Sequence, residues 1–264
     1  MPADAVKEFD LALDELRSNL HFVQTAARLR PRLGAMLHWQ NMDAEARSLV
    51  KAFMKQQGVQ ESLLYQGMVV VLAGAFEEFV RRLLHDSVVA LASSTPNYDE
   101  LDAALKAQNV YRTGIALTTV FEPPDHLDIN YEVLCRNIGT CTKGSSQHLL
   151  NAQAFTIFLA TISPKNLTDA LKRIGLKLNW DDIGRAAGMQ TVLQTTKTRE
   201  TSEATQHFLA EFAKKRNKIA HGGGGTIVIV AEDVEQFLDV FRAFARTLEG
   251  VVGSFLQKQT RPRK

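Results

Sequence analysis

The sequence predicts an all-α fold in which a single domain spans residues 1–264, and three observations lead to this expectation. Apolar residues recur at spacings of three and four over several long segments, which is the pattern of helices with one buried face. Proline and glycine separate these segments, for example at Pro31 and Gly58. The composition, with 45% hydrophobic and 23% charged residues, is that of an ordinary globular protein.

Four of the predicted helices lie in the first half of the chain, over residues 3–30, 44–56, 60–92 and 98–120. Pro31 is expected to end the first of them. We expect the helix over 60–92 to form the core, because it has the widest apolar face: Leu64, Met68, Val71, Leu72, Ala75, Phe76, Phe79, Val80, Leu83, Leu84, Val88 and Leu91.

Residues 123–200 are less regular, with short helices predicted at 147–162, 166–174 and 180–188. No long polar linker isolates this region. We therefore expect a mostly helical insertion packed on the core, and not a separate domain.

The last third of the chain predicts two helices joined by a short link. Residues 201–221 form a helix that the four glycines at 222–225 end. Val228 and Val230 indicate a short extended segment, and Glu232 and Asp233 open the final helix. This order predicts an antiparallel helical hairpin.

Composition excludes several classes of protein. The net charge of +2 is too small for a protein that coats nucleic acid through its overall field. The longest apolar run, at 68–75, is far shorter than the about 20 residues that span a bilayer, and no secretory signal is visible. We expect a cytoplasmic protein without membrane association. A polyanion would need a local basic patch, either at Lys214, Lys215, Arg216 and Lys218 or at Lys258, Arg261, Arg263 and Lys264, of which the second set is equally a solvated face.

Metal and cofactor sites are not indicated. Cys135, Cys141 and His148 are spaced too loosely for a zinc site. The glycines at 222–225 follow a helix and lack the lysine and serine of a phosphate-binding loop. We expect no cofactor, and ordinary core or surface roles for the histidines without a partner pattern: His21, His38, His85, His126 and His207.

The most informative segment is residues 212–222, FAKKRNKIAHG. It places Arg216 and His221 in an Arg-x4-His arrangement at the end of a helix, with four residues between them and Asn217 directly after the arginine.

The string RNKIAHG after a phenylalanine-rich helix resembles the motif of the HEPN superfamily, and of its RiboL-PSP-HEPN-like group in particular. The stretch LLYQGMVVVLAGAFEEFVRRLL at 63–84 is similar to the long helix of that group, with Glu77 or Glu78 at the position of its acidic residue. The resemblance implies a helical bundle of HEPN type.

The resemblance also implies a function. Such proteins are metal-independent endoribonucleases that cleave single-stranded RNA, usually as homodimers whose two motifs face a shared cleft, in bacterial defence or toxin–antitoxin systems. Arg216 and His221 would then be catalytic, and RNA and a second copy would be the partners, together with a cognate antitoxin or another defence partner where one exists. Supporting or RNA-binding roles would fall to Asn217, Lys218, Lys215, Glu77 and Glu78.

The chemistry of the two motif residues agrees with this implication. RNA cleavage without a metal ion needs groups that move protons at the 2′-hydroxyl and at the leaving oxygen, and a cation for the charge on the phosphate. The imidazole of His221 titrates near neutral pH, and the guanidinium of Arg216 is a permanently charged fork that fits a phosphate.

Geometry sets a condition on this role. Five positions along a regular helix correspond to a rotation of about 140°, so both side chains reach one phosphate only if the helix end loosens or a partner supplies one of them.

Other interpretations remain open at this point. Arg216 lies at the edge of an apolar stripe, so a structural ion pair with Glu77 or Glu78 would also explain it. Those two glutamates can instead form helix-surface pairs with Arg81 and Arg82. Asn217 is equally a capping or solvated residue, and Lys215 and Lys218 are equally surface lysines. The chain can also be a non-catalytic HEPN module that binds RNA or a protein, or a dimerisation scaffold.

Overall fold

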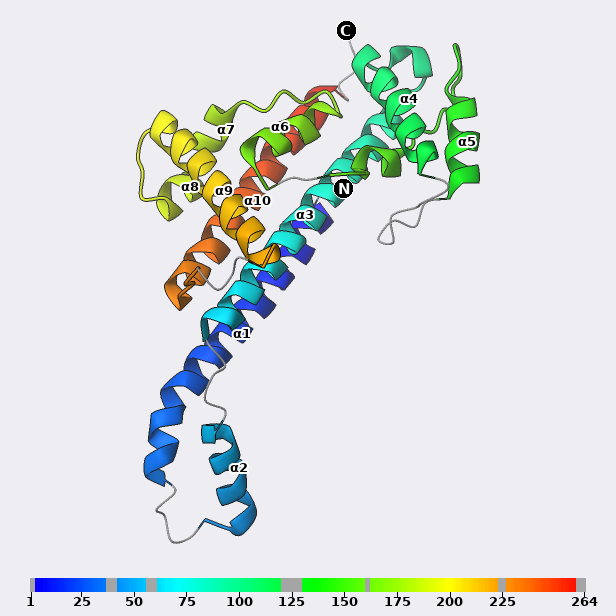
Figure 1. Cartoon of the computed structure of the whole chain (residues 1–264). Coiled ribbons are helices and arrows are strands. Elements are labelled where there is room, and N and C mark those ends of the chain that lie inside the picture. Colours follow the sequence, from blue (N-terminus) through cyan, green and yellow to red (C-terminus); the bar gives the residue numbers. More distant parts are fainter. Residues whose placement is uncertain are drawn as a thin grey trace.

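The computed structural model describes residues 3–36, 42–55, 61–119, 130–159, 162–222 and 227–259, and confirms the all-α class: none of these residues lies in a strand (Figure 1). The long helices are α1 (Ala3–Met36), α3 (Glu61–Ser94), α9 (Thr198–Ala220) and α10 (Ala231–Gln259). The shorter elements are α2 (Ala44–Lys55), η1 (Tyr98–Glu100), α4 (Ala103–Thr118), α5 (Tyr131–Thr140), η2 (Ala152–Thr156), α6 (Pro164–Lys172), α7 (Trp180–Gly184) and α8 (Ala187–Val192).

The core lies where α1, α3 and α10 pack side by side (Figure 1). Phe76 of α3 is at its centre, with its ring centroid 6.0 Å from that of Phe9 and 4.9 Å from that of Phe241. All three side chains are almost completely buried. The expectation that the helix around 60–92 forms the core is therefore correct for the residues on this side of α3.

Ion pairs set the antiparallel register of α1 against α10. Arg17 lies 2.5 Å from Asp239, and about two turns closer to the start of α1 Arg246 lies 2.8 Å from Asp10. Arg242 pairs with both Asp10 and Asp14. These pairs are partly exposed and each contributes only about 0–1 kcal/mol, so they select the register while the apolar contacts supply the stability.

The expected end of the first helix at Pro31 is wrong, because α1 continues to Met36. A proline inside a helix removes one backbone hydrogen bond, and the helix can continue beyond it when the other bonds are retained. The second half of α1 and the adjoining α2 extend away from the core as an arm (Figure 1). No described side chain of α2 is buried.

The middle of the chain differs in detail from the expectation. The segment predicted as one helix over 98–120 is η1 followed by α4, and the one over 147–162 contains only the short η2. The segment over 180–188 divides into α7 and α8, and α5 was not expected. The start of the predicted insertion, 123–129, lies outside the described residues. The later elements pack on the long helices: η2 on α3, α7 on α9, and α8 on α10.

The link at 227–230 is neither helix nor strand, and α3 holds it in place. Ile229 is fully buried and its N–H donates to Ser62 Oγ at 3.1 Å, while Gln66 Nε2 donates to the carbonyl of Ile227 at 2.7 Å. Val228 and Val230 are exposed. The link therefore runs along the first turns of α3.

α3 is also long and apolar enough to cross a membrane by length and composition, with a mean hydropathy of 1.5 over 18 residues. In the structure one side of this helix packs in the core, and 44% of that window is buried.

Candidate functional site

Aromatic packing positions the second half of α9, which carries the motif. The ring centroid of Phe212 is 5.1 Å from that of Phe237 and 4.6 Å from that of Phe241, so α9 lies on α10 through phenylalanine side chains. Lys215 follows on the same side. Its Nζ lies 3.8 Å from Asp233 and 5.2 Å from the centre of the Phe237 ring. Lys215 thus helps to hold α9 against α10.

The motif helix ends at His221. α9 is regular through Ala220, and the N–H of His221 donates to the carbonyl of Asn217 at 3.0 Å. Gly222 follows with φ +79°, a left-handed conformation that strains any other residue, and its N–H donates to the carbonyl of Ile219. The His221 side chain is exposed at this helix end. Gly223, Gly224 and Gly225 lie outside the described residues.

Arg216 is half-buried one turn and a half earlier. Its Nη1 donates to Asn217 Oδ1 at 3.2 Å, whereas its buried Nε has no hydrogen-bond partner among the described residues. No carboxylate in the described part of the chain forms an ion pair with this guanidinium within 4 Å. Most of its capacity to bind an anion therefore remains available.

Glu77 is the carboxylate that faces Arg216. α3 packs against α9, and burial raises the pKa of the Glu77 carboxyl above its ordinary value, while the charges of Arg216 and Arg81 act in the opposite direction. The charge of Arg216 acts to lower the pKa of the Glu77 carboxyl, but the two side chains form no ion pair within 4 Å. The described residues therefore do not contain the close ion pair between Arg216 and a glutamate of α3 that the structural interpretation of Arg216 required.

Glu78 has other partners than Glu77. Burial acts to raise the pKa of its carboxyl, but hydrogen bonds from Arg82 and Arg81 outweigh burial and lower that pKa. Arg82 also bonds Glu8 of α1. Glu78 therefore forms ion pairs with Arg81 and Arg82 along α3, as in the alternative interpretation of the two glutamates.

The two motif side chains leave α9 in different directions. Arg216 is turned toward α3, and His221 stands exposed at the helix end. The helix does not loosen between them, since it keeps its regular form through Ala220. Both side chains of one chain would reach the same phosphate only if the helix end loosened, and this is not observed. The other condition was that a partner supplies one of the two side chains.

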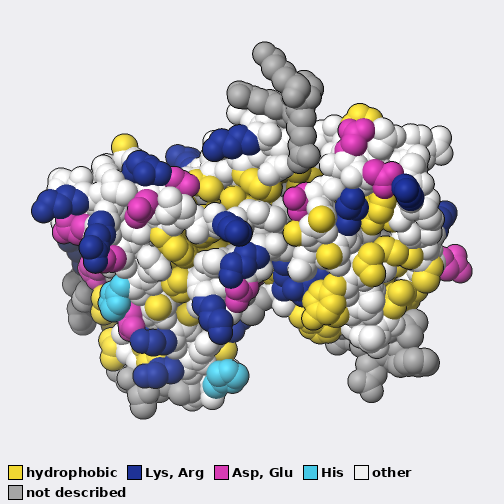
Figure 2. Space-filling model, turned by 90° about the horizontal axis from the view of Figure 1, so that it is seen from above, with side chains coloured by type: hydrophobic (Ala, Val, Ile, Leu, Met, Phe, Trp, Pro, Cys, Tyr) yellow, Lys and Arg dark blue, Asp and Glu magenta, His cyan; other side chains and the backbone are white. Residues whose placement is uncertain are grey.

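Of the remaining sequence candidates, Lys218 lies beside the motif, and the others among the described residues do not join this site. Lys218 is exposed at the end of α9, while Lys214 pairs with Glu211 at 2.6 Å. His148 is buried beside the Tyr98 ring, and Cys135 is exposed. In the described ranges no group of three His, Cys, Asp or Glu side chains could hold a metal ion. Arg261, Arg263, Lys264, His38 and His126 lie outside the described residues. On the face that Figure 2 shows, lysine and arginine side chains are interspersed with acidic ones.

Sequence reasoning missed the residues that hold the link after the motif. Ser62 and Gln66 form hydrogen bonds with its backbone. The sequence feature that could have identified them is two polar residues four positions apart on a side of α3 that is otherwise apolar. A buried polar side chain in such a stripe needs a partner, and here the partner is the backbone next to the motif.

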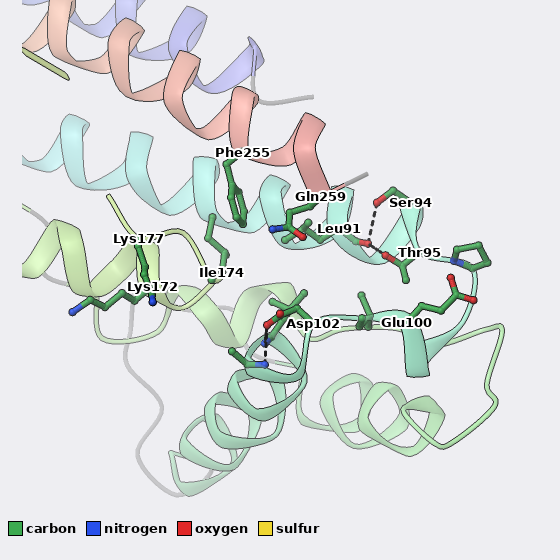
Figure 3. A pocket seen from close by; sticks show the side chains of 15 residues that line it. Leu91, Ser94, Thr95, Glu100, Asp102, Lys172, Ile174, Lys177, Phe255 and Gln259 are labelled. Carbon is green, nitrogen blue, oxygen red and sulfur yellow. Dashed lines mark hydrogen bonds between the residues drawn. The ribbon is translucent and has the colours of Figure 1, made fainter. Parts of the chain in front are cut away.

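A cavity lies away from the motif, at the other end of α3 (Figure 3). It measures about 770 Å³ and is formed between α3, α4, the segment after α6 and the end of α10. Leu91, Ile174 and Phe255 give it apolar walls, and Lys172 and Lys177 lie at one edge. None of the motif residues lines this cavity.

Comparisons with known proteins identify the family of this chain. The model of one protein family, described as RiboL-PSP-HEPN, matches residues 43–254, which includes α3, α9 and nearly all of α10. No curated protein and no solved structure matches the chain. Because the match covers most of the sequence, this chain belongs to the RiboL-PSP-HEPN family of the HEPN superfamily.

Proposed function

We propose that this chain is an endoribonuclease that cleaves single-stranded RNA without a metal ion. The observation that carries the proposal is the presence of an exposed imidazole and a half-buried guanidinium at the same end of α9, where no carboxylate of the described residues forms an ion pair with the guanidinium. Membership of a HEPN family makes an RNase-like or RNA-binding role the expected one.

The proposed reaction is a transfer within the RNA chain. The 2′-oxygen attacks the adjacent phosphorus, the bond from phosphorus to the 5′-oxygen breaks, and a 2′,3′-cyclic phosphate remains. His221 takes the proton of the attacking 2′-hydroxyl and gives a proton to the leaving 5′-oxygen, so the second product has a free 5′-hydroxyl. Arg216 donates hydrogen bonds to the phosphate oxygens, where negative charge increases in the transition state. Glu77 keeps the Arg216 side chain oriented through its charge.

Three other groups support RNA binding in this proposal. Lys218 is exposed and attracts the phosphate backbone, and Asn217 orients the Arg216 guanidinium through their hydrogen bond. Lys215 acts indirectly, because its contacts with Asp233 and Phe237 fix the last turns of α9. We place this activity in the cytoplasm, in a bacterial defence or toxin–antitoxin setting.

The test compares the wild type with His221→Ala and Arg216→Ala on mixed single-stranded RNA in excess chelator. Wild-type cleavage should persist, and each variant should lose about 100-fold or more of the rate while retaining its helical circular dichroism. Undiminished cleavage by His221→Ala would refute the catalytic assignment. RNA binding without any wild-type cleavage would support the second candidate, a non-catalytic RNA-binding module.

A further inference from the structure

The arm formed by the second half of α1 and by α2 belongs to the most basic region of the chain. Residues 18–55 contain six lysines and arginines and only two acidic residues, which gives this region a charge of +4. Because the whole chain has a net charge of +2, the remaining residues together carry −2. Positive charge is therefore concentrated in the region that includes the arm extending from the core (Figure 1).

Two exposed arginines of α1 carry much of this charge. Arg28 and Arg32 lie four residues apart, so their side chains project from the same side of the helix. Neither forms an ion pair or a hydrogen bond with a described residue. Arg17, earlier in the same helix, is instead paired with Asp239. We call Arg28 and Arg32 the arm arginines, and their charge is available to an anion outside the chain.

The arm leaves the core close to the end of the motif helix. At the base of the arm, Gln24 donates to Glu235 of α10 at 3.2 Å. Two residues earlier in α10, Asp233 lies 3.8 Å from Lys215 of α9. The first turns of α10 thus connect the base of the arm to the last turns of α9. From Gln24 to Met36 the arm is about 18 Å long, so an RNA strand that starts at the motif can continue along it.

Phe22 adds an aromatic ring at the base of the arm. Its side chain is 73% exposed, which is unusual for a phenylalanine in a helix that packs in the core. An exposed ring offers a face on which an unpaired base can stack, and proteins that bind single strands combine such rings with cationic side chains. In a duplex the faces of the bases are already stacked on each other. Phe22 and the arm arginines together therefore favour single-stranded RNA.

A membrane surface fits the arm less well. A helix that lies on a bilayer presents a continuous apolar face beside its basic residues. The exposed large apolar side chains of the described arm are Phe22, Leu29 and Leu49, and they are divided between α1 and α2. Others lie on α3, outside the arm. Leu64 and Val71 are exposed there, although the sequence predicted that they are buried, because α1, α9 and α10 pack on other sides of that helix.

We propose that the arm is a second RNA-binding site, where the arm arginines bind phosphates of a single strand and Phe22 stacks on one of its bases. The adjoining part of the same RNA then lies at the motif. The choice of RNA as the ligand rests on the proposed function. The site itself is not a property of the matched family region, because α1 precedes residues 43–254.

The first test measures binding by fluorescence anisotropy with a labelled single strand of about 20 nucleotides. All its 2′-oxygens are methylated, so that no 2′-hydroxyl can attack. Arg28→Gln/Arg32→Gln should bind about 10-fold or more weakly at low salt. The slope of log affinity against log salt should fall by about 1.4, because two phosphate contacts of about 0.7 each are lost.

Arg136→Gln/Lys165→Gln is the matched control for this variant. Both residues are exposed, on α5 and α6, and neither has an ion pair or a hydrogen bond with a described residue. The control removes the same two charges from other elements and should bind as the wild type does. Circular dichroism should show that both double variants fold, since exposed positions are changed. Wild-type affinity of the arm variant, or an equal loss in the control, overturns the proposal.

The second test compares Phe22→Ala on a methylated single strand and on a duplex of the same sequence. Loss of one stacked base should weaken single-strand binding by about 5-fold to 100-fold and leave duplex binding unchanged. Leu11→Ala is the control, because Leu11 is 64% exposed on the same side of α1 about three turns earlier. Unchanged single-strand binding by Phe22→Ala, or an equal loss with the duplex, contradicts the stacking role.

Sedimentation with phosphatidylserine vesicles tests the alternative occupant. The wild type and Arg28→Gln/Arg32→Gln should remain in the supernatant to the same extent, and vesicle binding that requires the arm arginines overturns the assignment to RNA. None of these measurements needs cleavage. RNA binding through the arm by a chain that cuts no RNA refutes only the proposed function, and cleavage by a chain whose arm variant binds RNA normally refutes only the arm site.

Discussion

Glu77 and Glu78 are neighbours on α3, yet the protein shifts the pKa values of their carboxyl groups in opposite directions. Burial dominates at Glu77 and raises its pKa, with Arg216 and Arg81 opposing. At Glu78 burial also acts upward, but the hydrogen bonds from Arg82 and Arg81 prevail and the pKa falls. Adjacent helical residues point about 100° apart, so one glutamate faces the motif helix and the other faces the surface beside α1.

Glu77→Gln and Glu78→Gln should therefore change the pH dependence of stability with opposite signs. Glu77 binds its proton more tightly when folded, so the wild type should lose stability relative to Glu77→Gln as pH rises through and above the ordinary value of 4.5. Glu78 binds its proton less tightly when folded. The wild type should gain stability relative to Glu78→Gln as pH rises toward and through 4.5. Urea unfolding between pH 3.5 and 7.5 measures both, and equal slopes would contradict the assignment.

Arg216→Ala and His221→Ala should complement each other when mixed. If each phosphate is held by Arg216 of one copy and cleaved with His221 of the other, a mixed dimer has one intact site and one doubly defective site. After subunit exchange, half of the dimers are mixed and activity should return to about a quarter of wild type. Single-stranded RNA cleavage measures this. Sites built within one chain give no recovery.

Lys218→Ala should weaken RNA binding without changing the chemistry. A lysine that neutralises a phosphate releases counterions, so its removal should lower the slope of log affinity against log salt by about 1. Fluorescence anisotropy with a labelled single-stranded RNA at several salt concentrations gives the slope. Lys106→Ala on α4 is the control, because that lysine is bonded to the carbonyl of Asp99 and should leave the slope unchanged. Equal slopes for Lys218→Ala and the wild type would remove Lys218 from the RNA site.

Phe9→Ala should destabilise the protein strongly, although Phe9 precedes the residues matched by the family model. Phe9 is 3% exposed and packs on Phe76 and Phe79, so the loss should be about 3–5 kcal/mol. Leu11→Ala is the control, since Leu11 is 64% exposed and its loss should change stability by no more than about 0.5 kcal/mol. Urea unfolding compares them. Similar values for both variants would mean that α1 is not part of the core.

Ile229→Ala should destabilise the protein by about 2–5 kcal/mol, because the side chain is fully buried in the link after the motif. Val228→Ala, one position earlier and 76% exposed, should not. The comparison is made by thermal and urea unfolding. A small effect of Ile229→Ala would show that the link is not held against α3.

The sequence predicted the long helices because their apolar periodicity is strong, and it located Arg216 and His221 because the motif is local. It could not give the neighbours of each face. Periodicity counts Leu64 and Val71 with the buried stripe, whereas burial depends on which helices pack nearby. The continuation of α1 beyond Pro31 was missed for a related reason. The free energy lost with one backbone hydrogen bond is small compared with the packing of a 34-residue helix.

The choice between Glu77 and Glu78 also required tertiary structure. Their identities and spacing are equivalent in the sequence, and only the position of α9 against one side of α3 separates them. The ion pair between Lys215 and Asp233 could not be predicted from the sequence either, since it depends on how α9 and α10 are placed. The polar side chains of Ser62 and Gln66 stand out in an apolar stripe of the sequence. That pattern does not show that their hydrogen-bond partner is the backbone of the link.

The pairing of α1 with α10 has a consequence for synthesis. Arg17 and Asp239 are 222 residues apart, so on a ribosome that adds about 5–20 residues per second α1 waits on the order of 10–40 s for its partner. For much of that interval Phe76 lacks its contact with the Phe241 ring of α10. The motif on α9 is likewise without support until α10 emerges. A nascent chain therefore carries the complete Arg-x4-His string before the end of α9 has its support, which comes only with the translation of α10.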